Sequence, residues 1–206
     1  KEPTWSFVLR REMFTPWYEP QSDSAERGLM YSQICLGVKN GDYVCGSEKQ
    51  LVKLTAKHYY IEFGPELDHS RMTRVLPAWI PDSSVAAHPL DWWIGQVQRV
   101  HQRAAYVDKL VSAAKVQAVV ISDSMKQWQR EFAHLTEVTI SDCHPDLNGR
   151  RGTLALHNNG IEFIDGSGPE SSALRFTVEY HNFLTVHSEG SRNAASMRLM
   201  LLGGSK

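Results

Sequence analysis

Residues 25–64 constrain the fold of this chain most, because they have the pattern of two amphipathic helices joined by one sharp turn. The first helix, over residues 23–39, is predicted by apolar side chains that recur every four residues, at Met30, Ile34 and Val38. Asn40 and Gly41 predict its end, since both tolerate the left-handed backbone that closes a helix. Neither apolar stripe can remain in water, so we expect the pair to pack against further helices.

The second helix is predicted to begin after Ser47, a good N-cap residue, and to end at Gly64. Its apolar face is predicted to contain Leu51, Leu54, His58 and Ile61. Further helices are expected over residues 68–76, from His88 onward, and over residues 106–127 as one continuous element. Pro77 is expected to end the third helix, and residues 82–87 to form a loop.

The pattern changes near residues 128–132, where short alternating segments replace the helical period. Asn159-Gly160 is a strong hairpin signal between two such segments. Antiparallel strands are expected over residues 132–140, 153–157, 161–164, 174–178, 183–186 and 197–202. One further strand is expected at residues 5–12, ahead of a proline-containing linker.

Bulk properties exclude several classes of function. The net charge of −1 gives no general basic field for nucleic acid. The three cysteines are an odd number at unpatterned spacing, which favours a reducing compartment over a disulfide framework. No signal peptide and no apolar run near the ~20 residues of a membrane helix occur in the sequence. The chain begins with Lys1, and we expect it to be a fragment of a longer protein.

Three segments, in the same order along the chain, resemble the second lobe of FERM domains. The resemblance is strongest to the FERM domains in the tails of class VII unconventional myosins. The segments are Leu29-Met-Tyr-Ser-Gln-Ile, Gly37-Val-Lys-Asn-Gly-Asp-Tyr43, and Leu51-Val-Lys-Leu-Thr-Ala-Lys-His-Tyr-Tyr-Ile-Glu-Phe-Gly64. Phe7-Val-Leu-Arg-Arg-Glu-Met-Phe-Thr-Pro-Trp17 resembles the join between the first two lobes, and Val75-Leu-Pro-Ala-Trp-Ile-Pro-Asp82 a proline segment of the family.

This resemblance implies an α+β fold of several lobes. Residues 1–20 would be the last strand of a ubiquitin-like first lobe with its linker, and residues 21–127 an acyl-CoA-binding-protein-like helical bundle. Residues 128–206 would form an antiparallel β-sandwich like that of pleckstrin-homology domains, with its closing helix missing.

The resemblance also implies the binding sites. The strand Phe183, Leu184, Thr185, Val186, His187 and Ser188 matches the one that borders the peptide groove of the third lobe, where a sheet edge accepts an added strand. An ordinary covered strand is an equal alternative. Lys206 matches part of a basic element that represses the motor.

Basic residues around the fourth helix are a third candidate site. Arg99, His101, Arg103 and Lys109 could contact acidic lipids or an acidic partner, although a solvated helix end is the simpler interpretation.

Catalytic and metal-binding patterns are missing from the sequence. Cys143-His144 offers two adjacent ligands, too few for a zinc site, and no phosphate loop or nucleophile elbow occurs. We therefore predict no metal, no cofactor and no enzyme activity; any ATPase would belong to a motor domain elsewhere. His58 is expected to be a core or boundary histidine with one hydrogen bond, in preference to a pH switch.

The resulting hypothesis is a non-catalytic tail module that binds peptide segments of adaptor or cargo proteins and contributes to motor autoinhibition by contact with the motor head. It would be cytoplasmic and cytoskeletal, in actin-rich protrusions such as microvilli, stereocilia or filopodia. The alternative is a FERM linker between membrane and cytoskeleton that binds phosphoinositides and receptor tails. An enzyme-attached FERM domain is a third interpretation.

Overall fold

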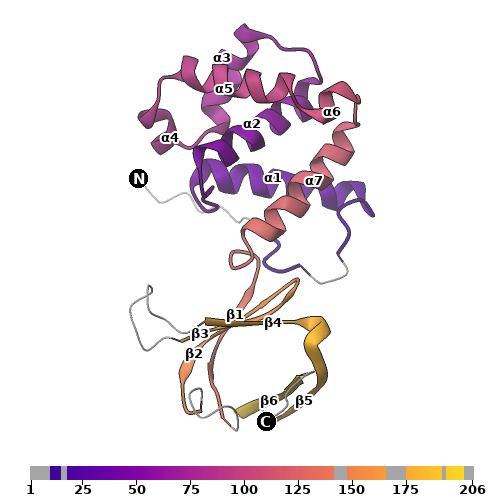
Figure 1. Cartoon of the computed structure of the whole chain (residues 1–206), viewed down its shortest axis with the longest axis vertical. Coiled ribbons are helices and arrows are strands. Elements are labelled where there is room, and N and C mark those ends of the chain that lie inside the picture. Colours follow the sequence, from indigo (N-terminus) through magenta and orange to yellow (C-terminus); the bar gives the residue numbers. More distant parts are fainter. Residues whose placement is uncertain (1–9, 15–17, 142–147, 166–174, 192–193, 202–206) are drawn as a thin grey trace, which may run out of the picture. The chain divides into compact units, whose positions relative to one another are not determined.

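The computed structural model of the chain describes residues 10–14, 18–141, 148–165, 175–191 and 194–201 (Figure 1). The chain forms two compact units. Lys1–Arg11 and Glu19–Trp128 make up the first, called the helical unit here, and Glu12–Tyr18 and Gln129–Lys206 the second, called the β unit. Of the strand predicted at residues 5–12, only residues 10–12 are described, and they have no strand structure.

The first two helices of the helical unit begin and end where local chemistry predicts. Helix α1 is Ser24–Asn40, and the Asp23 carboxylate caps it by accepting the amides of Ala25 and Glu26 at 2.7 and 2.9 Å. Helix α2 is Glu48–Phe63, capped by the Ser47 hydroxyl. Gly41 follows α1 with a φ of 83°, which confirms the predicted break.

Helix α3, His69–Trp79, continues past Pro77, so the predicted end at this residue is wrong. Proline removes one backbone donor, and this costs little near a helix end whose carbonyls find other partners. The Lys39 ammonium supports this end of α3 by donating to the Pro77 and Ile80 carbonyls, which have no helical donor, at 3.1 and 2.9 Å.

Residues predicted as a loop form the short helix α4, Asp82–Ala87. Pro81 precedes it, and the Pro81 carbonyl accepts the Ser84 and Val85 amides at 3.0 Å each. Helix α5 is Leu90–Gln102.

The single helix predicted over residues 106–127 is two helices, α6 Ala105–Asp108 and α7 Ala113–Gln127. Between them Leu110 has a φ of 47°, which an α-helix cannot contain. The Tyr60 hydroxyl stabilises the break by donating to the Val111 carbonyl at 2.7 Å. Apolar period alone does not reveal a break whose partner comes from another helix.

Helix α2 packs on both α5 and α7, while α1 packs on α7 and α3. The predicted α1 stripe is confirmed, since Met30, Ile34 and Val38 are all buried. The predicted α2 face is partly wrong, because only its Leu51 is fully buried. Contact with helices on two sides buries a wider face of α2, made of Leu51, Val52, Thr55, Ala56, Tyr59 and Tyr60.

A packed aromatic pair closes the helical unit near its last residue. Tyr43 stacks on Trp128 with ring centroids 5.3 Å apart, and the Trp128 indole donates to the Val44 carbonyl at 2.9 Å. Gln33 donates to the Tyr43 hydroxyl at 2.8 Å. Gly37 lies against this ring, and a Cβ there would come within 2.4 Å of it.

The β unit contains two antiparallel sheets in the described residues. One has the order β1-β2-β3-β4, with bounds His134–Thr139, Arg151–His157, Gly160–Asp165 and Arg175–Glu179. The other pairs β5, Phe183–Ser191, with β6, Ala194–Leu201. A 3₁₀ turn, Tyr180–Asn182, lies between β4 and β5.

The predicted hairpin is present between β2 and β3. His157 pairs with Gly160, so Asn158 and Asn159 form the turn. The buried His157 ring helps to fix it, since Nδ1 accepts the Asn159 amide at 3.2 Å. Gly160 is required by close packing, because a Cβ there would meet the Val178 carbonyl oxygen at 2.2 Å.

Candidate functional site

The predicted peptide-binding residues, 183–188, all belong to β5. The sheet order gives β5 one neighbour, β6, so its other edge has no partner strand among the residues that the structure describes. Pairing shifts between Phe183 and Thr185, and the Thr185 side chain is exposed. The arrangement offers backbone donors and acceptors to an extended segment.

The predicted basic surface is reduced from four residues to three. Arg99, Arg103 and Lys109 are exposed, and they lie in the last turn of α5, directly after α5, and directly after α6. His101 is fully buried, and its Nε2 bonds to the Pro65 carbonyl at 3.0 Å. Lys206 and residues 142–147, which include Cys143, lie outside the described residues.

His58 belongs to a polar cluster with Tyr31 and Cys35, of which Tyr31 is buried and the other two are half-buried. The Tyr31 hydroxyl hydrogen-bonds to His58 Nδ1, and the Cys35 sulfur lies 3.7 Å from the same atom. Burial lowers the pKa of His58 to about 4 and raises the pKa of Cys35 to about 12. At neutral pH both groups are uncharged, which suits a structural cluster and leaves no thiolate for nucleophilic chemistry.

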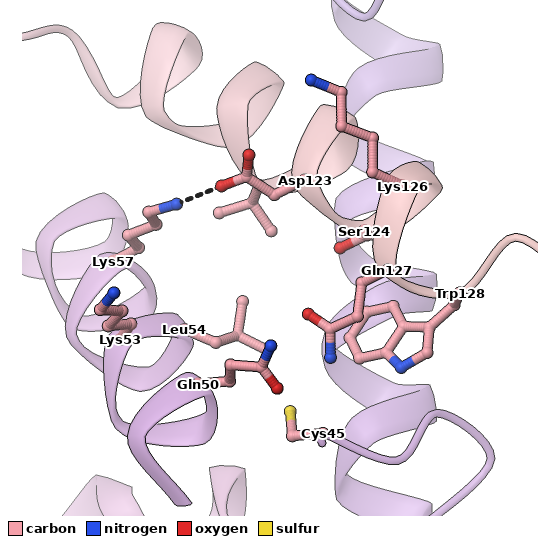
Figure 2. A pocket seen from close by; sticks show the side chains of 11 residues that line it. Cys45, Gln50, Lys53, Leu54, Lys57, Asp123, Ser124, Lys126, Gln127 and Trp128 are labelled. Atoms are coloured by element: carbon pink, nitrogen blue, oxygen red, sulfur yellow. Dashed lines mark hydrogen bonds and ion pairs between the residues drawn. The ribbon is translucent and has the colours of Figure 1, made fainter. Parts of the chain in front are cut away.

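A groove between α2 and α7, called the α2/α7 groove, was missed by sequence reasoning (Figure 2). It has a volume of about 560 Å³, within the range of roughly 300–1,000 Å³ typical of ligand pockets. It is lined by Cys45, Gln50, Lys53, Leu54, Lys57, Val120, Asp123, Ser124, Lys126, Gln127 and Trp128.

Three lysines and one carboxylate line the α2/α7 groove. Lys57 on α2 donates to Asp123 on α7 at 2.6 Å, the contact that Figure 2 marks across the groove. Lys53 and Lys126 are exposed and form no ion pair with any described residue. The signal in the sequence was the spacing of Lys49, Lys53 and Lys57, which places three cations along one side of α2.

Metal sites and membrane-spanning helices are both absent from the described part of the chain. No group of three or more His, Cys, Asp or Glu side chains there could hold a metal ion. No helix there is both long and apolar enough to cross a membrane.

Comparisons with known proteins agree with the architecture. No protein-family model matches the chain. Myosin-VIIa of Drosophila melanogaster is 27% identical over 163 residues, which are 78% of this chain and 8% of that protein. The structure of the FERM and C-terminal domain complex of Drosophila Merlin matches with a TM-score of 0.58 at 10% identity, over 86% of this chain and 55% of that one.

The MyTH4-FERM MF2 domain of Dictyostelium discoideum myosin VII matches with a TM-score of 0.54 at 14% identity, over 95% of this chain and 39% of that one. The chain therefore has a FERM-like fold, with helices and a four-stranded antiparallel sheet. It is similar to the FERM region of class VII myosin tails, as the sequence segments predicted. It spans about 8% of the length of the curated relative.

Proposed function

We propose that this chain is a non-catalytic module in the tail of an unconventional, actin-based myosin, and that it binds peptide segments of adaptor or cargo proteins. The observation that carries the proposal is the similarity to Myosin-VIIa over 163 residues. The helical unit is shorter than this, so the match must include residues of both units. An adaptor-binding tail is the function that a FERM-like fold in this context supports best.

Within this proposal the lobes are assigned as follows. Residues 21–127 are the acyl-CoA-binding-protein-like second lobe, which the seven helices of this region support. Residues 128–206 are the pleckstrin-homology-like third lobe, supported by the two antiparallel sheets of the described residues. Residues 1–20 are the end of a first lobe and its linker.

The edge of β5 is the proposed peptide-binding site. A strand that pairs on one side only presents unpaired backbone groups, and an extended peptide satisfies them by forming the next ladder. In such binding, affinity depends mainly on the extended backbone of the partner, and its side chains add specificity. This suits a module that recognises unstructured adaptor segments.

The test is to select binders from a random peptide library against the whole chain, and to measure their affinity for two variants. Thr185→Pro places a proline in β5, and Thr136→Pro places one in β1, whose free edge in the described residues provides a matched control. We expect Thr185→Pro to weaken binding by about tenfold or more, since strand addition depends on backbone donors. Thr136→Pro should leave the affinity unchanged.

Circular dichroism of both variants separates a lost site from a lost fold. Thr185→Lys keeps the backbone donor, so it should weaken binding less than Thr185→Pro. If the folded Thr185→Pro variant binds as well as the unchanged chain, β5 is not the site. If selection yields no binder at all, the adaptor-binding function itself is wrong.

A second candidate function is attachment to membranes through acidic phosphoinositides. The observation that favours it is the exposure of Arg99, Arg103 and Lys109 near the ends of α5 and α6. It predicts binding to phosphoinositide vesicles that falls steeply with salt and is lost in the Arg99→Glu/Arg103→Glu variant. Contact with a motor head, and a role of Lys206 in it, would be a further property of the whole protein.

A further inference from the structure

The α2/α7 groove is built from two walls of different charge (Figure 2). Helix α2 contributes Lys53 and Lys57, while α7 contributes Asp123 and Lys126. The lining therefore contains three lysines and one carboxylate, an excess of two positive charges in a chain whose net charge is −1. Because Lys53 and Lys126 have no acidic partner among the described residues, the groove is complementary to an anion.

Between these charges the groove is apolar. Leu54, Val120 and Trp128 line it; Val120 and Trp128 are only 1% and 3% exposed, so the half-buried Leu54 presents most of the apolar surface. Apolar surface in a pocket adds affinity for an occupant that carries an apolar group of its own. A bare phosphate or a carboxylate alone would leave this surface unused.

Two amides complete the lining. Gln50 on α2 and Gln127 on α7 each offer a donor and an acceptor, which is the pair that a peptide backbone needs. The Cys45 thiol beside them hydrogen-bonds to Gln127, and burial raises the pKa of Cys45. This thiol stays protonated at neutral pH and adds no competing negative charge.

We propose that the α2/α7 groove binds an acidic peptide segment in which an apolar side chain lies between carboxylates. The apolar side chain would pack on Leu54, the most accessible apolar residue of the lining, and the carboxylates would pair with Lys53 and Lys126. A lipid headgroup matches the charges, but it brings nothing for the apolar lining or the amides. This site lies in the helical unit and does not depend on the β5 edge in the β unit.

The Lys57–Asp123 contact allows a test in which a substitution should strengthen peptide binding. Asp123 is the one acidic side chain in the lining, and it both repels an acidic ligand and occupies Lys57. Asp123→Asn removes that charge and frees Lys57, so it should tighten binding of an acidic peptide. A purely structural role of this ion pair predicts the opposite, since its loss would loosen the two walls.

The experiment uses a fluorescein-labelled octapeptide, Glu-Glu-Glu-Leu-Phe-Glu-Glu-Glu, titrated into the whole chain with fluorescence polarisation as the readout. We expect Lys53→Glu/Lys126→Glu to weaken binding by about tenfold or more, because like charges then face each other. The matched control, Arg74→Glu/Lys115→Glu, makes the same change in net charge at exposed positions of α3 and α7 outside the lining. It should change affinity less than about twofold at physiological salt, where the Debye length is about 8 Å.

Further probes identify what is recognised. An octapeptide with Ser-Ser in place of Leu-Phe should bind about tenfold more weakly if the apolar lining contributes. Amide NMR signals of Lys53, Lys57, Ser124 and Gln127 should shift on titration, and Thr185→Pro should bind the octapeptide normally. That last result separates this site from the proposed function at β5.

Several outcomes would overturn the proposal. Equal losses in Lys53→Glu/Lys126→Glu and the control would show a general charge effect. Weaker binding in Asp123→Asn would show a structural role. Binding of phosphoinositide vesicles that needs Lys53 and Lys126, with no binding of the octapeptide, would identify the groove as a lipid site.

Discussion

The helical unit and the β unit offer other molecules different parts of the chain. The helical unit presents the side chains of the α2/α7 groove, which is lined by lysines from both helices and by apolar residues. The β unit presents the backbone, because the outer strands of its two sheets have an edge with no partner strand in the described residues. A groove recognises charge and shape, whereas an edge recognises an extended conformation, so one chain can select partners by two independent criteria.

The half-buried His58 of the helical unit and the buried His157 of the β unit are satisfied differently. His58 accepts from Tyr31, which comes from another helix, while His157 accepts from the amide of Asn159 in its own turn. Burial lowers the pKa of both histidines, and for His157 the nearby Glu162 opposes the shift. The contact of His58 therefore joins two helices, whereas that of His157 stays within one turn.

The largest expected difference between the units is in how acid changes the free energy of unfolding. The pKa of His58 is about 4 in the folded chain against 6.5 in the unfolded chain, so the unfolded state binds the proton first. The stabilisation is therefore present above pH 6.5 and is lost as the pH falls from 6.5 towards 4. We expect the loss from this residue to be about 3 kcal/mol, measured by urea unfolding followed by helical circular dichroism.

His58→Gln is the matched variant, because it can still accept from Tyr31 and cannot take up the proton. Its unfolding free energy should fall less steeply between pH 6.5 and 4 than that of the unchanged chain. His157→Gln should reduce the slope as well, because the pKa of His157 is also lowered. If the unfolding free energies of His58→Gln and the unchanged chain fall equally steeply with pH, protonation of His58 does not destabilise the helical unit.

The same substitution, glycine to alanine, should have opposite signs in the two units. At Gly160 the new methyl would collide with the Val178 backbone, and we expect a loss of about 2 kcal/mol. At Gly95 in α5 no heavy atom beyond the neighbouring residues and backbone of its own helix lies within 4 Å of the new methyl, so the helix should gain about 1 kcal/mol. Thermal and urea unfolding of both variants would measure this. A Gly160→Ala variant that is not destabilised would contradict the packing of β3 against β4, and a destabilised Gly95→Ala variant would contradict the open space at Gly95.

The smallest effect is expected at the start of α1. Asp23→Ala removes the acceptor for the Ala25 and Glu26 amides and should cost about 1 kcal/mol. Asp23→Asn keeps an acceptor and should cost only a few tenths of that. Amide hydrogen exchange in the first turn of α1 would localise the change, and equal exchange in both variants would show that the cap contributes little.

The features predicted correctly from the sequence depend on neighbouring residues. Ser47 caps the helix that follows it, Gly41 ends the helix before it, and the Asn-Gly pair at 159–160 predicts a hairpin that the structure contains, because these signals act within a few positions. The break at Leu110 was missed because its partner, Tyr60, lies in another helix.

The candidate sites follow the same division. The β5 strand was recognised from a local pattern and from resemblance, and its role in peptide binding remains a prediction. The α2/α7 groove could not be predicted, since the Lys57–Asp123 contact that crosses it joins residues 66 positions apart. The lysine spacing on α2 predicts a basic helix face, but the opposite wall becomes known only from the packing.

The contact between Gly37 and the Tyr43 ring has an evolutionary consequence. The ring is held by Trp128 and Gln33, so it cannot move aside for a larger residue at position 37. In descendants of this sequence, substitutions at positions 37 and 43 should therefore occur together. Any side chain larger than hydrogen at 37 should be accompanied by a side chain smaller than tyrosine at 43. A joint substitution of this kind would mark lineages in which the turn after α1 has been rebuilt.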